Sequence, residues 1–328
     1  MMLLKTPEET PVMKQYRDLK RSAGDALLLF RMGDFYELFG DDAIEAARIL
    51  EITLTTRDKG KPDALPMAGV PHHSVGGYLQ KLLNAGKKVA IGEQLENPAQ
   101  SKGIVRREIV RILTPGIQFD LSGNEGGVCL AAWVGPPQAR AAAILDPSTG
   151  EVWWAGPMEE ERLLDELEGY PIRHLLCFQG ELSQSGRKRL GDSGGVLVES
   201  LPENYLTVES ALDLLSRHYG VAAPESFTGS LPGALALGIV LHYVLRTQGL
   251  KKLPHLRLPR PIRQPGSLRF GSRTFQHLDL FPDLFHFLKR TRSSVGTRQL
   301  KRWLQNPLLQ VGEIRARQEA VREVATDP

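Results

Sequence analysis

Cysteine and long apolar runs are scarce in this chain of 328 residues. Its two cysteines, Cys129 and Cys177, cannot form the disulfide framework of a small secreted domain, so we expect a reducing, cytoplasmic setting. The apolar run at the N-terminus is too short for a signal peptide, and no stretch approaches the roughly 18 consecutive apolar residues of a membrane span. Hydrophobic residues still make up 41% of the chain, which is an ordinary globular content. The composition therefore excludes a secreted scaffold, a membrane protein and a disordered tail protein.

Sequence motifs of the common enzyme classes are also missing. There is no phosphate loop of the form G-x-x-x-x-G-K-[ST], because the nearest match, Gly86-Lys87, lacks the upstream glycine and the final Ser or Thr. The motifs G-x-S-x-G, C-x-x-C and H-E-x-x-H do not occur either. We therefore expect no catalytic residues, no metal, no cofactor and no enzymatic activity in this chain.

Two isolated features can be explained either by a structural role or by a functional site. His72 and His73 are adjacent on an irregular segment, so their side chains diverge, and no cysteine or third histidine lies nearby; a structural role is favoured over a metal site. Asp146 follows a predicted strand and would suit a nuclease, but a two-metal nuclease needs several converging acids. The following residues 147–150 (PSTG) make Asp146 a turn former first.

The net charge of +3 hides three segments of different charge. Residues 1–117 carry 17 Lys and Arg against 15 Asp and Glu, residues 118–245 carry 7 against 17, and residues 246–328 carry 17 against 6. An acidic middle between cation-rich ends indicates separate modules with different partners. The basic segment is a plausible footprint for a polyanion such as DNA, although solvated helix faces alone would explain a charge run.

Hydrophobic patterning predicts an α/β first module. The expected strands and helices are bounded by turn residues, and Asp42 with Glu45 has the spacing of a capping box. Strands are expected at 26–31, 35–39, 52–56, 89–95 and 108–113, and helices after Asp42 and from Ser74.

A polar linker at 118–126 leads into a mixed α/β middle module and then into helices. Strands are expected at 127–134, 140–145, 151–154 and 174–178, and helices at 159–168 and 208–219. Further helices are expected at 234–248, 281–291, 296–304 and 311–325. The last helix runs almost to the end of the chain, so we expect the sequence to be a truncated piece of something larger.

The segment 31–40 (RMGDFYELFG) is the most informative. Phe35 and Glu37 alternate with Tyr36, so they point to the same side of their strand. Taken alone, this pattern is more simply explained by Phe35 filling a core and Glu37 facing solvent.

A longer set of motifs changes that judgement. The segments TPVMKQY (10–16), GDFYELF (33–39), LTTR (54–57), PMAGVPHH (66–73), YLQKLLNAGKKVAIGEQ (78–94), SKG (101–103) and VRILTPG (110–116) resemble the N-terminal domain of the MutS family of mismatch-repair proteins. The segment DPSTGE (146–151) resembles the family's connector domain. The segments TQ (247–248), LPHL (253–256), GTRQLKRWLQNPL (296–308) and RARQ (315–318) resemble the start of its helical lever domain.

The resemblance covers essentially the whole chain and implies an α/β multidomain fold. It implies a mixed α/β mismatch-recognition domain at 1–117, a linker at 118–126, a ribonuclease-H-like α/β connector domain at 127–245 and the start of an all-α lever domain at 246–328. Gly92, Asn97 and Ile117 stand where the family usually has Cys, Asp and Thr, and 266–280 matches only approximately, so its role is left open. The family's remaining lever, clamp and ATPase are absent from this sequence.

The function that the resemblance implies is recognition of mismatched or looped base pairs in duplex DNA, which initiates mismatch repair. In the family the Phe of Phe-x-Glu stacks on a mispaired base in the minor groove and the Glu hydrogen-bonds that base; these residues correspond to Phe35 and Glu37. Arg57 aligns with a DNA-contacting arginine of the family, and Met67 and Gly69 are expected in a loop that borders the groove. Candidate phosphate contacts, assigned by charge alone, are Lys59, Lys61, Lys102, Arg106 and Arg107.

The resemblance also implies partners. These are mismatched double-stranded DNA, the downstream protein MutL through the connector domain, and a second copy in the full-length family. ATP and magnesium belong to the family's ATPase domain, which is absent here, and the implied location is cytoplasmic and nucleoid-associated. The alternative is a non-enzymatic structural or interaction protein that retains the fold.

Overall fold

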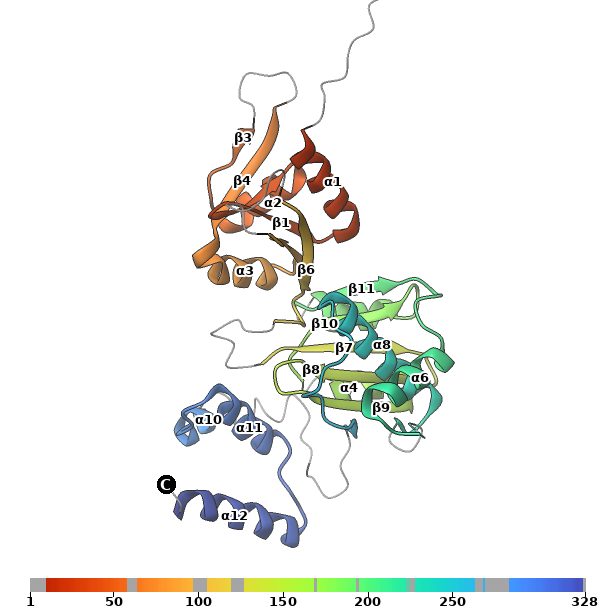
Figure 1. Cartoon of the computed structure of the whole chain (residues 1–328). Helices are drawn as coiled ribbons and strands as arrows, with labels where there is room; N and C mark the ends of the chain where they lie inside the picture. The colour runs from red at the N-terminus through yellow and green to blue at the C-terminus, as the bar shows by residue number, and fades with distance from the viewer. Residues whose placement is uncertain are drawn as a thin grey trace, which may run out of the picture. The chain divides into compact units, whose positions relative to one another are not determined.

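The computed structural model describes residues 10–57, 64–96, 105–118, 127–167, 170–192, 195–222, 224, 228–262, 268 and 283–326. These residues form two compact units (Figure 1). The first takes the described residues up to 118 together with 243–252, and the second takes the remainder. None of the described helices is long and apolar enough to cross a membrane.

The first unit is built on a six-stranded mixed sheet with the order β3-β4-β2-β1-β5-β6. Only β1 and β5 run parallel; the other neighbouring pairs are antiparallel. The strands are β1 (Leu27–Met32), β2 (Phe35–Phe39), β3 (Thr55–Arg57), β4 (Leu65–Pro71), β5 (Val89–Gln94) and β6 (Arg107–Leu113). The helices are α1 (Pro11–Ala23), α2 (Asp41–Leu50) and α3 (Val75–Asn84), with a 3-10 turn, η1, at His72–Ser74.

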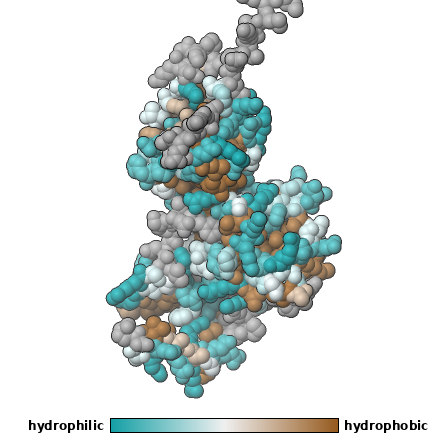
Figure 2. Space-filling view, in the orientation of Figure 1, coloured by the Kyte–Doolittle hydropathy of each residue, from teal (hydrophilic) through white to brown (hydrophobic). Residues whose placement is uncertain are grey.

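Strand alternation gives this sheet a core on each face. Leu27, Leu29, Tyr36 and Leu38 lie in one core with apolar residues of α2 and α3, while Leu28, Phe30 and Phe39 lie in the other with Tyr16 of α1. Both cores are almost completely buried. On the face drawn in Figure 2, the surface of both units is mostly hydrophilic, with hydrophobic side chains in small separate patches.

Three local expectations for this unit are wrong. Helix α2 begins at Asp41 with Gly40 as N-cap, so Asp42 is not a cap. Its buried carboxylate instead accepts a hydrogen bond from the Leu28 backbone N–H at 3.0 Å and pairs with Lys20 at 2.8 Å. The strand expected at 52–56 is confined to Thr55–Arg57, and the segment expected as a loop around Met67 is strand β4.

The second unit has a six-stranded sheet with the order β11-β10-β7-β8-β9-β12. β7, β8 and β9 form an antiparallel meander, and β10 and β11 continue from β7 in parallel. The strands are β7 (Cys129–Val134), β8 (Arg140–Asp146), β9 (Glu151–Met158), β10 (Ile172–Phe178), β11 (Leu197–Leu201) and β12 (Arg260–Pro261). Counted from β7, the order 3-2-1-4-5 is that of a ribonuclease-H-like sheet, as expected.

Helices α4 (Glu160–Leu167) and α5 (Gln184–Arg187) with the π turn η2 (Lys188–Asp192), then α6 (Val208–Tyr219) and α8 (Leu231–Thr247), complete the middle of the chain. After them come α10 (Phe285–Leu288), α11 (Ser294–Gln305) and α12 (Val311–Thr326). The helix expected at 281–291 is thus much shorter, and its first two positions lie outside the described residues. The mixed α/β class with helices at the C-terminal end is confirmed.

Removing the Asp42 carboxylate tests its place in the fold. Asp42→Ala leaves the buried Leu28 N–H without an acceptor and Lys20 without its anion, so we expect the free energy of unfolding to fall by about 1–3 kcal/mol. The neighbouring exposed Asp41 provides the control, because Asp41→Ala removes a carboxylate from the same turn. Urea unfolding of the two variants checks this, and equal stabilities would contradict it.

Candidate nucleic-acid interface

Phe35 begins β2 and is 44% exposed, unlike the other aromatic side chains of this strand. The tight turn before it is held by two hydrogen bonds: Arg31 Nε donates to Gly33 O at 2.6 Å, and His72 N donates to Asp34 O at 2.9 Å. Gly33 has a φ of +59°, a backbone conformation that favours glycine. The local structure therefore presents a large apolar ring to solvent at the edge of a rigid turn.

Phe35, Glu37 and Phe39 share one face of β2 and become progressively more buried along the strand. Phe39 lies under α1, where its ring makes an edge contact with Tyr16 at 4.8 Å between centroids. The Arg57 guanidinium lies 5.7 Å from the centroid of the Phe39 ring. We call Phe35, Glu37 and Phe39 the Phe35–Phe39 row. Phe39 is buried in the core, whereas Phe35 projects into solvent.

The Glu37 carboxylate lies against the backbone of Gly69, its register partner on β4. A Cβ atom at position 69 would come within 2.5 Å of Glu37 Oε2, so only glycine leaves room for this arrangement. Burial raises the pKa of Glu37 above its usual 4.5, and the nearby Arg57 charge partly offsets that rise. The site thus holds a half-buried carboxyl group that resists ionisation.

Met67 and Gly69 belong to β4 and not to the loop that the sequence predicted. Met67 pairs with Phe39 on β2 and with Thr55 on β3, and its side chain packs partly buried against the core beneath α1. Pairing with β2 brings both residues beside the Phe35–Phe39 row. The predicted loop was therefore wrong, but both residues lie beside the Phe35–Phe39 row.

The candidate cations differ in how far they are available. Arg57 ends β3 next to Glu37, and the exposed Arg106 pairs with Glu108. Arg107 is only 8% exposed; its Nε donates to Arg31 O at 2.6 Å and its guanidinium lies 4.8 Å from the Phe30 ring centroid. This burial argues against a phosphate contact for Arg107. Lys59, Lys61 and Lys102 lie outside the described residues.

The structure places the features for which the sequence left two explanations open. His72 and His73 form η1, and no group of three metal-binding side chains occurs in the part of the chain that the structure describes. Asp146 Oδ1 accepts hydrogen bonds from Ser148 N at 2.9 Å and Thr149 N at 3.2 Å, so it shapes the turn after β8. Cys129 and Cys177 are buried free thiols.

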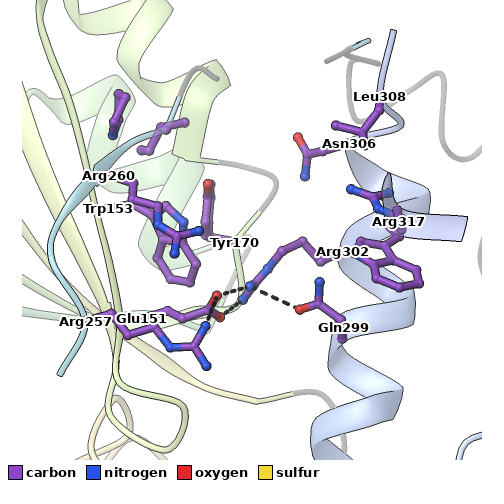
Figure 3. A pocket seen from close by; sticks show the side chains of 13 residues that line it. Glu151, Trp153, Tyr170, Arg257, Arg260, Gln299, Arg302, Asn306, Leu308 and Arg317 are labelled. Carbon is purple, nitrogen blue, oxygen red and sulfur yellow. Dashed lines mark hydrogen bonds and ion pairs between the residues drawn. The ribbon is translucent and has the colours of Figure 1, made fainter. Parts of the chain in front are cut away.

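A cleft of about 420 Å³ lies in the second unit between β9 and α11 (Figure 3). Arg302 reaches from α11 to Glu151 with both terminal nitrogens and lies 4.8 Å from the Trp153 ring centroid. Arg317 lies 4.5 Å from the Trp303 ring centroid. The cations and rings at this cleft contact one another. The contacts of Arg302 with Glu151 and Trp153 hold α11 against the sheet. Sequence reasoning missed the cleft because the partners are about 150 residues apart.

Comparison with known proteins decides the family. A model described as MutS domain I matches residues 10–122, one described as MutS domain II matches 129–257 and one described as MutS domain III matches 262–328. The chain belongs to the MutS family. The MutS domain I match contains the whole Phe35–Phe39 row together with β3 and β4.

Relatives named DNA mismatch repair protein MutS align along nearly the whole chain. Those of Syntrophomonas wolfei and Thermotoga neapolitana are 37% and 35% identical and align with 96% and 97% of this chain. The relative in Streptococcus gordonii is 36% identical over 97% of it. These alignments cover 38%, 39% and 37% of the three MutS relatives, so the chain spans well under half of their length.

The raised pKa of Glu37 makes stability depend on pH in a defined direction. Ionisation is less favourable in the folded than in the unfolded protein, so the folded state loses stability as pH rises above about 4.5 and through the higher folded-state pKa. Glu37→Gln, which cannot ionise, should therefore gain stability relative to the parent protein between about pH 4 and about pH 7. Urea unfolding at each pH measures the difference. A difference that shrinks with rising pH would mean that Arg57 dominates.

The contact between Gly69 and Glu37 can be tested separately. Gly69→Ala should push the carboxylate toward solvent and lower the pKa of Glu37 toward 4.5, because the added Cβ occupies its present position. NMR titration of carboxyl-labelled glutamate follows this pKa. Gly76→Ala is the control, because a Cβ in that part of α3 meets open space. An unchanged pKa in Gly69→Ala would contradict the packing argument.

Proposed function

We propose that this chain recognises mismatched or looped base pairs in duplex DNA and so takes the first step of DNA mismatch repair. The observation that carries the proposal is the exposed ring of Phe35 beside the half-buried carboxyl group of Glu37, both within the segment that matches MutS domain I. Phe35 acts as a wedge in the minor groove, and Glu37 hydrogen-bonds the displaced base.

An apolar wedge can distinguish a mismatch from a paired step by energy alone. Unstacking a base step and kinking the duplex costs a few kcal/mol. A mismatched base has already lost part of its pairing and stacking, so the same wedge enters there at lower cost. The 44% exposure of Phe35 supports this role, because the ring is accessible before DNA binds.

The environment of Glu37 suits a carboxyl group that must enter a negatively charged groove. An ionised carboxylate is repelled by phosphates unless it accepts a hydrogen bond from a base N–H. Burial that raises the pKa favours the protonated form, which avoids the repulsion and can donate to a base acceptor instead. Gly69 keeps the carboxyl group in this position, and Arg57 supplies a nearby positive charge.

Phosphate contacts would come from cations around this row. Arg57 and Arg106 are the described candidates, and Lys59, Lys61 and Lys102 remain candidates by charge. Met67 borders the groove from β4. These contacts would position the protein without reading sequence.

The remaining parts of the proposal concern partners. We infer that MutL binds the acidic domain at 127–245, that the complete protein forms a homodimer, and that it works in the cytoplasm on the nucleoid. The chain itself is proposed to lack catalysis, with ATP and magnesium used by segments of the family that this sequence does not contain. The competing function is a structural or interaction protein that retains the fold without reading mismatches.

Substitution of Phe35 separates these two functions. Phe35→Ala should lower the ratio of affinities for mismatched over paired duplex by about 5- to 150-fold, because base–aromatic stacking contributes about 1–3 kcal/mol. Its unfolding free energy should fall by less than about 1 kcal/mol, whereas a core Phe→Ala substitution costs about 3–5 kcal/mol. Dissociation constants must be measured at one salt concentration. Ile44→Ala on α2 is the control for loss of an exposed apolar side chain.

Glu37→Ala should have a different signature from Phe35→Ala. Removing an acid near phosphates should leave or raise the affinity for paired DNA and narrow the preference for mismatches. If Phe35→Ala unfolds the domain yet keeps discrimination in whatever remains folded, Phe35 is a core residue and the wedge is wrong. If the unaltered chain does not distinguish the two duplexes, the competing structural function is favoured.

A further inference from the structure

Tyr36 lies between Phe35 and Glu37 in β2, but its side chain occupies the opposite face of the sheet. It is 4% exposed and packs in the core shared with α2 and α3. Its hydroxyl donates a hydrogen bond to the Glu93 carboxylate on β5. Because β1 separates β2 from β5, this bond joins two strands that are not neighbours in the sheet.

The strand spacing explains why two long side chains are needed for this bond. Neighbouring strands lie about 4.8 Å apart, so the backbones of β2 and β5 are roughly 10 Å apart. Tyr36 pairs with Arg31 on β1, and Glu93 directly follows Gly92, which pairs with Phe30. Tyr36, Arg31 and Glu93 therefore form one row across three strands.

Arg31 extends this row to the turn that precedes Phe35. Its guanidinium carbon lies 5.4 Å from the centroid of the Tyr36 ring, and its Nε donates to Gly33 O at 2.6 Å. The turn and the strand on either side of Phe35 are thus fixed by connected side chains. Burial, and then the Glu93 bond and charge, raise the pKa of Tyr36 to about 12, so the hydroxyl remains a donor at neutral pH.

We propose that Tyr36 is a positioning residue for the interface: its bond to Glu93 fixes the start of β2 and thereby the direction in which Phe35 and Glu37 project. The inference rests on the proposed mismatch recognition. A wedge that enters a base step must be held within about 0.5 Å by contacts that support it. Ladder bonds to β1 and β4 hold the backbone of β2, and Phe35 is the first of its paired positions. The bond to a third strand adds a side-chain restraint at the residue that follows Phe35.

Tyr36→Phe tests the inference because it removes the hydroxyl and keeps the ring, its packing and the position of the Arg31 guanidinium over the ring. In the full chain we expect the ratio of mismatched to paired affinity to fall by about 3- to 10-fold, with paired affinity unchanged. The fluorescence of 2-aminopurine beside the mismatch, measured at saturating protein, should fall because the wedge unstacks that base less completely. Tyr78→Phe on α3, at the edge of the same core, is the matched control.

A double-mutant cycle with Glu93→Ala assigns the effect to the bond. In the Glu93→Ala background, Tyr36→Phe should produce no further loss of discrimination. Two results would overturn the positioning role. One is an equal loss of affinity for the mismatched and the paired duplex in Tyr36→Phe. The other is a loss of discrimination that adds to the loss caused by Glu93→Ala. Wild-type discrimination in Tyr36→Phe, alongside its loss in Phe35→Ala, would overturn the inference and leave the proposed function standing. Unchanged discrimination in both variants would remove the proposed function and the inference together.

Discussion

The register of β2 between β1 and β4 is the constraint on which the interface depends. Side chains alternate along a strand, so a slip of one residue would exchange the two faces completely. In the observed register Tyr36 and Leu38 complete one core, and Phe39 completes the other. Folding of both cores therefore selects the one register that leaves Phe35 outside. The ring of Phe35 is exposed because both cores form, and the proposed restraint from Tyr36 and Glu93 concerns only the direction in which the ring projects.

The second unit uses charge in another way. The segment 118–245 is strongly acidic and the segment that follows is strongly basic, and Glu151 pairs with Arg302 across that boundary in the sequence. The ion pair is only slightly exposed and lies on the face of Trp153, so it is screened less than a surface pair. Opposite charge in consecutive modules thus contributes to how they pack within this unit.

Much of the fold could be predicted from the sequence because its signals are local. The limits of β2 and α6 follow from alternating and helical apolar patterns and agree with the structure. Strand β4 could not be predicted, because Pro66, Gly69 and Pro71 disfavour strands and are accommodated here by pairing with β2 and β3. Helix α1 was missed, although its apolar residues recur at helical spacing and could have been found.

The residues of the candidate site could be proposed from the sequence, but the environments of their side chains could not. Burial depends on neighbours that are distant in the chain. The charge of Arg107 therefore did not indicate that its guanidinium lies over the Phe30 ring. The sequence around Asp42 likewise did not indicate that its carboxylate accepts a hydrogen bond from the Leu28 backbone. The row of Tyr36, Arg31 and Glu93 depends on three strands and has no signature in any one of them. Resemblance suggested the proposed roles of Phe35 and Glu37, and the structure supplied a reason for a glycine at 69.

The glycine at position 69 links the choice of residue there to the choice of residue at position 37. The first atoms that a larger residue at position 69 would meet belong to the Glu37 carboxyl group, so a change at one position alters the place of the side chain at the other. An aspartate at position 37 would withdraw the carboxyl group by one methylene and would leave more room for an alanine at position 69. Changes at these two positions should therefore tend to occur together among related sequences, and a glutamine at 37, which has the length of glutamate, should favour glycine at 69.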